Sequence, residues 1–304
     1  MRYNLITILG PTAVGKTKLS AQLANKFNGE IISADSRQVY KGMDIGTGKD
    51  IDDYTIDGSI VRFHLIDVIS PSDEFDLYKF TKLFHSSFEV ISLKEKMPFL
   101  VGGTGLYLHS ILTNYNLAYV DFNSARAEEL KVMKEEDLKK IIMALNPNHH
   151  NTTDLTDKER MIKAILVAES STENKYNLTP INSLNIGVRL DREEKKLRIT
   201  KRLKERLENG MIEEVERLVG EGITHDKLHF FGLEYKYVSL YLQNQLNYND
   251  MYQKLNSAIH NFAKRQMTWF RKMEREGTRI NWIEGPDFNE ASKIIEKDFI
   301  KESV

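Results

Sequence analysis

The sequence predicts an α/β fold, with a parallel sheet covered by helices on both faces and a small all-helical insertion. Three observations lead to this prediction. In the first third of the chain, short apolar runs alternate with helical patterns, which is the spacing of βαβ units. The first apolar run ends at a glycine loop that opens a helix. Residues 114–180 carry two helical patterns but no strand-like run.

The individual elements follow from the spacing of apolar residues. Leu5–Leu9 is a continuous apolar run, typical of a buried parallel strand, and residues 16–27 repeat apolar side chains at helical spacing. The same criteria predict further strands at 31–33, 60–66, 99–101, 186–190 and 279–283, and further helices at 75–91, 125–145, 156–169 and 289–300.

Polar stretches at 146–157 and 170–180 flank the second helical pattern of the insertion. We therefore expect a discontinuous core domain formed by residues 1–113 and 181–304. A helical insertion domain at 114–180 interrupts it. No internal repeat or low-complexity segment is visible.

The composition is that of a globular protein. A chain of 304 residues with 41% hydrophobic and 29% charged residues can form one large domain and a smaller one, and it fits neither the disordered nor the fibrous class. The absence of cysteine excludes disulfides, thiolate nucleophiles and cysteine-based zinc sites. The run Leu5–Leu9 is too short for a signal sequence or a membrane span. We expect a cytoplasmic protein with no membrane partner.

The net charge of −1 conceals two basic segments. Residues 189–206 contain nine basic and four acidic residues, and residues 260–279 contain six basic and two acidic ones. Two basic faces can therefore coexist with a nearly neutral molecule and bind a polyanion. Two solvated helix faces would have the same composition.

Residues 10–17 read GPTAVGKT and fit the phosphate-binding pattern G-x-x-x-x-G-K-[ST], between a predicted strand and a predicted helix. In such a P-loop, backbone N–H groups and the helix N-terminus surround a phosphate. Lys16 adds a positive charge, and the Thr17 hydroxyl can bind Mg²⁺. The expected fold is thus a P-loop parallel-sheet core. The predicted phosphate-binding residues are Gly10, Pro11, Thr12, Ala13, Val14, Gly15, Lys16 and Thr17.

Nucleotides and diphosphate esters present the same oxygens to a P-loop, so other residues must identify the ligand. A P-loop nucleoside triphosphatase usually has a second strand that ends in a Mg²⁺-binding aspartate, and the one fair candidate is Asp67. The strand at 99–101 ends in Gly102-Gly103-Thr104-Gly105 without an acid, which favours a small transferase over a motor or switch. That glycine segment either forms a tight strand-to-helix turn or lets the backbone approach a ligand.

Asp35 follows the predicted strand at 31–33, at the sheet edge where open α/β folds bind ligands. A carboxylate there can act as a general base, and Lys16 and Mg²⁺ would keep it ionised. An aspartate at the end of a strand equally well caps a turn with Ser36. The residues alone leave both roles open.

Within residues 191–210, basic side chains recur at three- or four-residue spacing, at Lys195, Arg198, Arg202 and Arg206. A row of guanidinium groups can bind phosphates bidentately, although solvated ion pairs along a helix give the same pattern.

Residues 263–272 interleave basic and aromatic residues, a combination typical of RNA binding. The helical spacing of Phe262, Gln266, Trp269 and Phe270 also fits a core seam. We predict that the rings belong to the core and that some of the neighbouring cations bind RNA.

Six segments together resemble the bacterial tRNA dimethylallyltransferase (tRNA isopentenyltransferase) family and follow the order of the family. They are GPTAVGKT at Gly10, DSRQVYKGMDIGTGK at Asp35, HLIDVISP at His64, VGGTGLY at Val101, the pattern R-x₅-RI-x₂-R at Arg192 and AKRQMTWFR at Ala263. They span nearly the whole chain. Asp-Ser-x-Gln-Val-Tyr and Lys-Arg-Gln-x-Thr-Trp are far more specific than a P-loop.

The resemblance implies transfer of a dimethylallyl group from dimethylallyl diphosphate to the exocyclic N6 of the adenosine 3′-adjacent to the anticodon, with release of diphosphate. The P-loop then holds diphosphate in place of ATP, with Mg²⁺ as cofactor. The family pattern implies that Asp35 takes the amine proton and that Lys16, Thr17 and Arg202 stabilise the leaving diphosphate. The partner would be the anticodon stem-loop of tRNA, with the target base flipped out. The residues implied in tRNA binding are Asp35, Ser36, Arg37, Gln38, Thr104, Arg126, Glu159, Arg160, Lys163, Lys264 and Arg265.

The chain departs from the family pattern in three places. The family usually has GTAKP where this chain has Gly46-Thr47-Gly48-Lys49-Asp50, and GYKE where it has Gly232-Leu233-Glu234-Tyr235-Lys236. The insertion is short, and its usual arginine pair reads Arg160 and Lys163. These changes bear on tRNA binding more than on the allyl chemistry, because the P-loop and Asp35-Ser36-x-Gln38 are intact.

Two other functions fit parts of the sequence. A P-loop small-molecule or nucleoside kinase would use Asp35 as a base toward a hydroxyl group, but leaves residues 263–272 without a role. A nucleotide-gated RNA-binding module would keep the basic faces but assigns nothing to Asp35. We expect the chain to act as a monomer.

Overall fold

A computed structural model describes residues 3–115, 120, 122, 124–145, 157–170 and 179–300. The chain forms two compact units, residues 1–115 with 179–304 and residues 116–178. The division falls two residues inside each boundary expected from the sequence.

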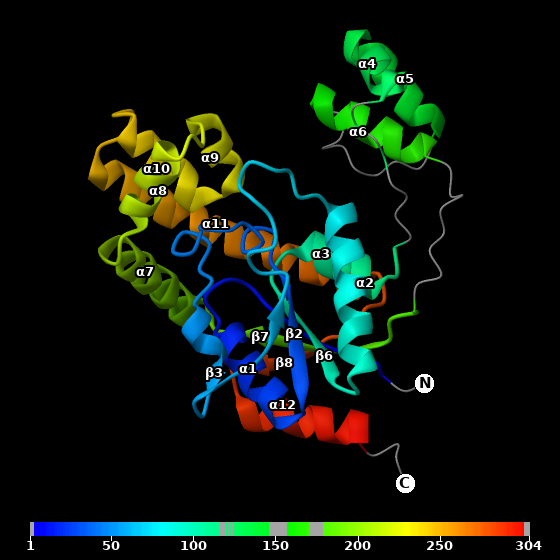
Figure 1. Cartoon of the computed structure of the whole chain (residues 1–304), viewed down its shortest axis with the longest axis vertical. Coiled ribbons are helices and arrows are strands. Elements are labelled where there is room, and N and C mark those ends of the chain that lie inside the picture. The colour runs from blue at the N-terminus through cyan, green and yellow to red at the C-terminus, as the bar shows by residue number, and fades with distance from the viewer. Residues whose placement is uncertain are drawn as a thin grey trace. The chain divides into compact units, whose positions relative to one another are not determined.

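A six-stranded parallel sheet with the strand order β5-β2-β6-β1-β7-β8 forms the centre of the larger unit (Figure 1). The central strands β1 and β6 pair Ile6 with Phe99, and β2 and β6 pair Ile32 with Leu100. The strands are β1 (Leu5–Leu9), β2 (Gly29–Ala34), β5 (Phe63–His64), β6 (Met97–Gly102), β7 (Ser183–Arg189) and β8 (Asn281–Glu284).

The predicted strand at 60–66 is wrong as a single strand. Its first residue belongs to β4 (Ser59–Ile60), which forms an antiparallel hairpin with β3 (Thr55–Ile56), and only β5 joins the sheet. Leu65 ends the extended conformation because its backbone is left-handed, with φ of 64°. The apolar run at 60–66 therefore contributes to two different strand pairings, that of β4 with β3 and that of β5 with β2.

Side chains of β1 point alternately into two hydrophobic cores, one on each face of the sheet. Leu5 and Leu9 pack in the core that contains residues of α2 and α3, whereas Ile6 and Ile8 pack in the core that contains residues of α1 and α12. A parallel strand that is buried on both faces has a continuous apolar sequence, and for this reason β1 could be predicted from the sequence.

The helices of the larger unit confirm the predicted cover on both faces of the sheet (Figure 1). They are α1 (Lys16–Lys26), α2 (Leu77–Leu93), α3 (Gly105–Leu112), α7 (Arg192–Glu208), α8 (Met211–Gly220), α9 (His225–Phe231), α10 (Leu233–Leu242), α11 (Tyr248–Arg275) and α12 (Phe288–Ile295), with short helical turns at Ile51–Tyr54 and Glu296–Ile300. In the part of the chain that the structure describes, no helix has both the length and the hydrophobicity needed to cross a membrane.

The smaller unit is helical in its described residues, with α4 (Ala125–Val132), α5 (Glu135–Leu145) and α6 (Lys158–Glu169). The single helix predicted at 125–145 is wrong, because Met133 is extended, with ψ of 154°. Because of this break, Leu130 of α4 and Leu138 of α5 both pack with Ile165 of α6 in one small core. The helix predicted at 156–169 begins at Lys158, and position 156 lies outside the described residues.

Candidate active site

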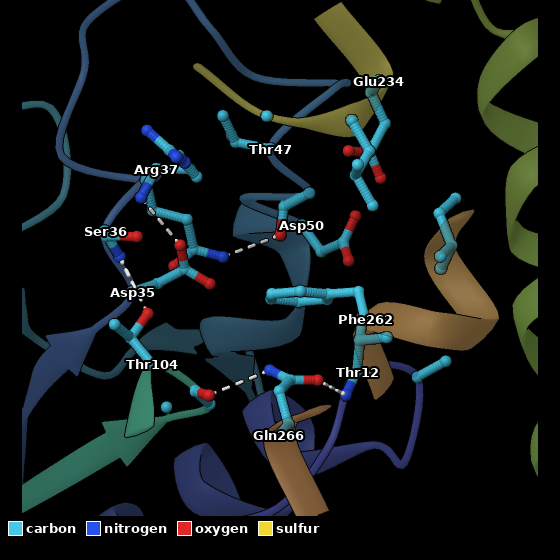
Figure 2. Close-up of a pocket in the computed structure, with 18 of the residues that line it drawn as sticks. Thr12, Asp35, Ser36, Arg37, Thr47, Asp50, Thr104, Glu234, Phe262 and Gln266 are labelled. Carbon is cyan, nitrogen blue, oxygen red and sulfur yellow. Dashed lines mark hydrogen bonds between the residues drawn. The ribbon is translucent and has the colours of Figure 1, made fainter. Parts of the chain in front are cut away.

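Three loops meet at one edge of the sheet, because β2, β6 and β1 are neighbours and parallel. Residues 10–15 follow β1, residues 35–38 follow β2 and residues 103–104 follow β6. Together with α7 and α11, they line a pocket of about 870 Å³, shown in Figure 2. This edge is where open α/β sheets bind ligands.

The loop after β1 has the geometry of a phosphate-binding loop. Gly15 caps α1 in the left-handed region, with φ of 85°, which glycine adopts without strain. Gly10 lies so close to β7 that an added Cβ would be 2.3 Å from the Val188 carbonyl oxygen. Lys16 Nζ donates a hydrogen bond of 2.6 Å to the Pro11 carbonyl and so folds across the loop. The positive charge thus lies beside the first turn of α1, where anions are favoured.

Lys16 carries a depressed pKa. Burial, and next the charge of the nearby Arg202, lower the pKa of its ammonium group to about 7, although Asp35 acts in the opposite direction. An anion bound at the loop would raise the pKa again, because it favours the charged form. Anion binding at this loop is therefore coupled to the protonation of Lys16.

Asp35 caps a turn and also faces the pocket. Its Oδ1 accepts a hydrogen bond of 2.8 Å from the Arg37 backbone N–H, so the residue caps the turn that follows β2. The same side chain lines the pocket (Figure 2), and its charge acts on the pKa of both Lys16 and Arg202. Turn capping by one oxygen therefore holds the carboxylate at the pocket.

Hydrogen bonds connect the loop after β2 to its neighbours. The Ser36 N–H donates to Thr104 Oγ1 at 3.1 Å. Gln38 accepts from Ser33 Oγ at 3.1 Å and donates through Nε2 to the Gly48 carbonyl at 2.9 Å. The loops after β2 and β6 and the segment 46–50 are thus held together at the pocket.

Gln266, on α11, is the main site residue that sequence reasoning assigned only to a core seam. Its Oε1 accepts from the Thr12 N–H at 2.8 Å and its Nε2 donates to the Gly103 carbonyl at 2.9 Å (Figure 2). An added Cβ at Gly103 would lie 2.4 Å from Nε2, so the glycine leaves room for this bridge. A buried glutamine in an apolar seam needs hydrogen-bond partners, and this requirement was the available signal.

The glycine segment after β6 packs closely against α11. An added Cβ at Gly105 would lie 2.5 Å from Trp269 Cγ. The space at Gly103 and Gly105 therefore serves contact with Gln266 and Trp269 of α11. Thr104, between them, lines the pocket.

The prediction that the rings of residues 262–270 belong to the core is wrong for Phe262. Phe270 is fully buried, Trp269 is half-buried and lines the pocket, and Phe262 exposes 38% of its surface and lines the pocket as well. Figure 2 shows its ring projecting into the pocket beside Thr12 and Gln266. One turn of α11 separates Phe262 from Gln266, so the face that bridges the loops also presents this ring to the pocket.

The basic row of α7 divides between pocket and solvent. Arg198, Arg202 and Arg206 line the pocket, whereas Lys195 does not. Arg202 Nη2 donates a hydrogen bond to Thr12 Oγ1 of the P-loop. Burial, and next the charge of Arg206, lower the pKa of Arg202 to about 10. Positive charge is thus concentrated opposite the P-loop.

Asp67, the candidate second acid for Mg²⁺, belongs to a different cluster. Its carboxylate pairs with the ammonium of Lys49, which is buried and also contacts Asp44 Oδ1 and the Tyr40 carbonyl, both at 2.7 Å. Asp67 does not line the pocket. The described residues contain no cluster of three or more acidic or histidine side chains arranged for a metal ion. Thr17 lines the pocket.

The remaining residues predicted to bind tRNA are divided between the two units. Arg37 lies over the exposed ring of Phe230, 5.0 Å from its centroid, and both Arg37 and Arg265 line the pocket. Lys264 is exposed beside it on α11.

In the smaller unit, two of the predicted cations are held by acids of the same unit. Arg126 donates to Glu169 at 3.0 and 2.7 Å and to Glu129 at 3.0 Å. Lys163 pairs with Glu159 at 2.6 Å, and Arg160 is exposed. Their use by a polyanion would require exchange of these ion pairs.

The chain matches two family models. Residues 38–273 match the model described as IPP transferase, and residues 3–67 match the model described as isopentenyl transferase. The first match alone covers more than two thirds of the chain.

Similar proteins extend over nearly the whole chain. A tRNA dimethylallyltransferase 2 of Citrifermentans bemidjiense is 50% identical, over 93% of this chain and 91% of its own. A tRNA dimethylallyltransferase 1 of Syntrophus aciditrophicus is 49% identical, over 95% and 96%. The crystal structure of the tRNA isopentenylpyrophosphate transferase of Bacillus halodurans matches with a TM-score of 0.69 and 31% identity, over 99% of this chain and 96% of that one.

Proposed function

The chain belongs to the IPP transferase family, that of the tRNA dimethylallyltransferases, and on this basis we propose that it transfers a dimethylallyl group from dimethylallyl diphosphate to N6 of the adenosine 3′-adjacent to the anticodon of tRNA. The observation that supports the proposal most is the convergence of Asp35, Lys16 and Arg202 on one pocket. A carboxylate and two cations in one pocket are the groups that transfer from a diphosphate to an amine requires.

In the proposed reaction, the N6 amine attacks C1 of the allyl group, and the bond between C1 and the diphosphate oxygen breaks. The diphosphate leaves with the electron pair of that bond, and Asp35 accepts the proton released by the amine. Lys16, Arg202 and the N–H groups of the P-loop stabilise the negative charge that develops on the leaving oxygen. Each group acts directly on the atoms whose charge changes.

Mg²⁺ is the proposed cofactor, and the residues of the pocket fit it in a limited way. The Thr17 hydroxyl would hold the ion together with diphosphate oxygens and water, which suits the preference of Mg²⁺ for oxygen ligands and retained waters. When bound, Mg²⁺ would neutralise part of the diphosphate charge. The protein itself supplies the cations Lys16 and Arg202 for the same purpose.

For tRNA, we propose contacts with the pocket rim and with the smaller unit. Ser36, Gln38 and Thr104 would hold the flipped adenosine, because their amide and hydroxyl groups suit hydrogen bonds to base edges. Arg37, Lys264 and Arg265 would contact phosphates. In the smaller unit, the proposed contacts are Arg126, Glu159, Arg160 and Lys163.

The test is transfer of radiolabelled allyl from dimethylallyl diphosphate to bulk tRNA that lacks the modification, with Mg²⁺ and no ATP. We expect label in tRNA and stoichiometric release of diphosphate. A parallel reaction with ATP and no allyl donor serves as the control for kinase activity. Absence of label, with ATP consumed in the control, would replace the proposed transferase by a kinase.

A further inference from the structure

Arg206 is a buried guanidinium without a hydrogen-bond partner among the described residues. It lies one turn after Arg202 on α7, and its side chain exposes only 10% of its surface. Its ion pairs with Asp50 and Glu234, at 3.7 and 3.8 Å, are too long for hydrogen bonds. A guanidinium has five N–H donors, and those of Arg206 keep access to the pocket, because none of its nitrogen atoms is fully buried without a partner. This arrangement indicates a ligand that supplies acceptor oxygens.

Two departures from the family pattern meet at Arg206. An added Cβ at Gly48 would lie 1.7 Å from Arg206 Nη2, so the alanine of GTAKP would exclude this guanidinium from its place. Asp50 belongs to the same segment, and Glu234 belongs to the segment that replaces GYKE. Gly48 therefore provides the space for Arg206, and Asp50 and Glu234 provide its counter-charges.

Arg206 also borders the diphosphate side of the pocket. It lines the main pocket and an adjoining one of about 310 Å³, and Arg202, Asp50 and Glu205 line both as well. The helical rise places the two arginines about 6 Å apart along the axis, on the same face of α7. Their mutual repulsion contributes to the lowered pKa of Arg202. An anion bound between them would remove that repulsion.

We propose that Arg206 is a second arginine for the donor, which binds the phosphate oxygens of dimethylallyl diphosphate that the P-loop does not surround. The inference rests on the proposed function. Arg202 contacts the P-loop through Thr12, and Arg206 extends the cationic wall away from it. Bidentate pairing with phosphate is the contact that guanidinium groups make best.

The test measures binding of inorganic diphosphate, with Mg²⁺, to the free full-length protein by calorimetry. Arg206→Met keeps much of the side-chain volume and removes the charge, and we expect its Kd to rise roughly tenfold to a hundredfold. Arg206→Lys keeps the charge but loses the paired N–H donors of the guanidinium, and we expect its Kd for diphosphate to rise roughly threefold to tenfold. Lys204→Met is the matched control, because Lys204 is exposed on the same helix and lines neither pocket.

The outcomes separate this inference from the proposed function. If the wild type binds diphosphate and Arg206→Met binds it within about twofold while Arg206→Lys folds normally, the assignment of Arg206 is overturned. It is also overturned if only the KM for tRNA rises, because the phosphate is then that of the tRNA backbone. A wild type that does not bind diphosphate at all contradicts the proposed function itself. Thermal unfolding of each variant identifies losses that come from misfolding.

Discussion

The two walls of the pocket are built in different ways. The wall on the side of the sheet consists of loops whose backbone is fixed by glycines and by short hydrogen bonds, with Gln266 joining the P-loop to the turn after β6. The wall on the side of α7 consists of long charged side chains, and its arginine Arg206 is held only by ion pairs of 3.7 and 3.8 Å. The comparison suggests that Asp35 on the sheet wall supplies the chemistry and that Arg206 on the helix wall adjusts affinity for the donor.

The largest effect is expected from removing the cation of the sheet wall. Lys16→Met should lower kcat/KM about a hundredfold to a thousandfold, because a preorganised charge at the leaving group is lost. Lys18→Met is the matched control, since Lys18 lies two residues further on α1 and is exposed. Steady-state allyl transfer to tRNA measures both. If kcat/KM decreases less than about threefold for Lys16→Met, the sheet wall does not stabilise the leaving group through this cation.

The bridge made by Gln266 tests the rigidity of the sheet wall. Gln266→Leu leaves the Thr12 N–H and the Gly103 carbonyl without their partner, and we expect the free energy of unfolding to fall by about 2 kcal/mol. The KM for the donor should rise as well, because the P-loop loses its support. Urea unfolding provides the measurement, with Gln245→Leu, at an exposed position on the surface, as the control. Equal stability of the two variants would show that the bridge contributes nothing.

The pKa of Lys16 predicts how donor binding depends on pH. In the free protein this pKa is about 7, so the ammonium is fully charged only below that value. Donor affinity should therefore be highest below pH 7 and fall by up to about tenfold per pH unit above it, until the raised pKa of the complex is reached. Lys16→Arg should flatten the profile, since a guanidinium stays charged across this range. Calorimetric titration from pH 6.5 to 9 would reveal a flat wild-type profile if the coupling is absent.

The smallest effect is expected from the counter-charges of the helix wall. Glu234→Gln removes one carboxylate that competes with the diphosphate for Arg206, so the Kd for diphosphate should fall by roughly twofold to fivefold. Glu205→Gln is the control, because Glu205 lines the same pocket but pairs with Lys201 at 3.7 Å. Weaker binding by Glu234→Gln would mean that this carboxylate positions Arg206 more than it competes.

The sheet wall was largely predictable from the sequence. Leu5–Leu9, the P-loop and the strand-end position of Asp35 are local patterns, because a buried parallel strand, a glycine loop and the edge of a sheet each have a characteristic spacing. The hydrogen bond from Arg37 to Asp35 is local as well.

The side-chain environments of the helices, in the helix wall, in α11 and in the smaller unit, were much less predictable, because they depend on contacts between distant segments. Helical periodicity placed Phe262 and Gln266 on one apolar seam. It did not show that the Phe262 ring faces the pocket while Gln266 is buried and hydrogen-bonded to the P-loop. The burial of Arg206 depends on the space at Gly48, and nothing in the pattern of α7 indicates it. The break at Met133 has no glycine or proline to mark it, and follows from packing against α6.

A single-turnover experiment on Asp35→Asn and Arg206→Met tests the division between the two walls most directly. Pre-bound tRNA is mixed with increasing dimethylallyl diphosphate, which yields the rate at saturation and the Kd of the donor separately. Asp35→Asn should lower the saturating rate by about two to four orders of magnitude and leave the donor Kd unchanged. Arg206→Met should raise the Kd of the donor and change the saturating rate little. If both variants alter the same parameter, the two walls do not divide chemistry from affinity, and the account is contradicted.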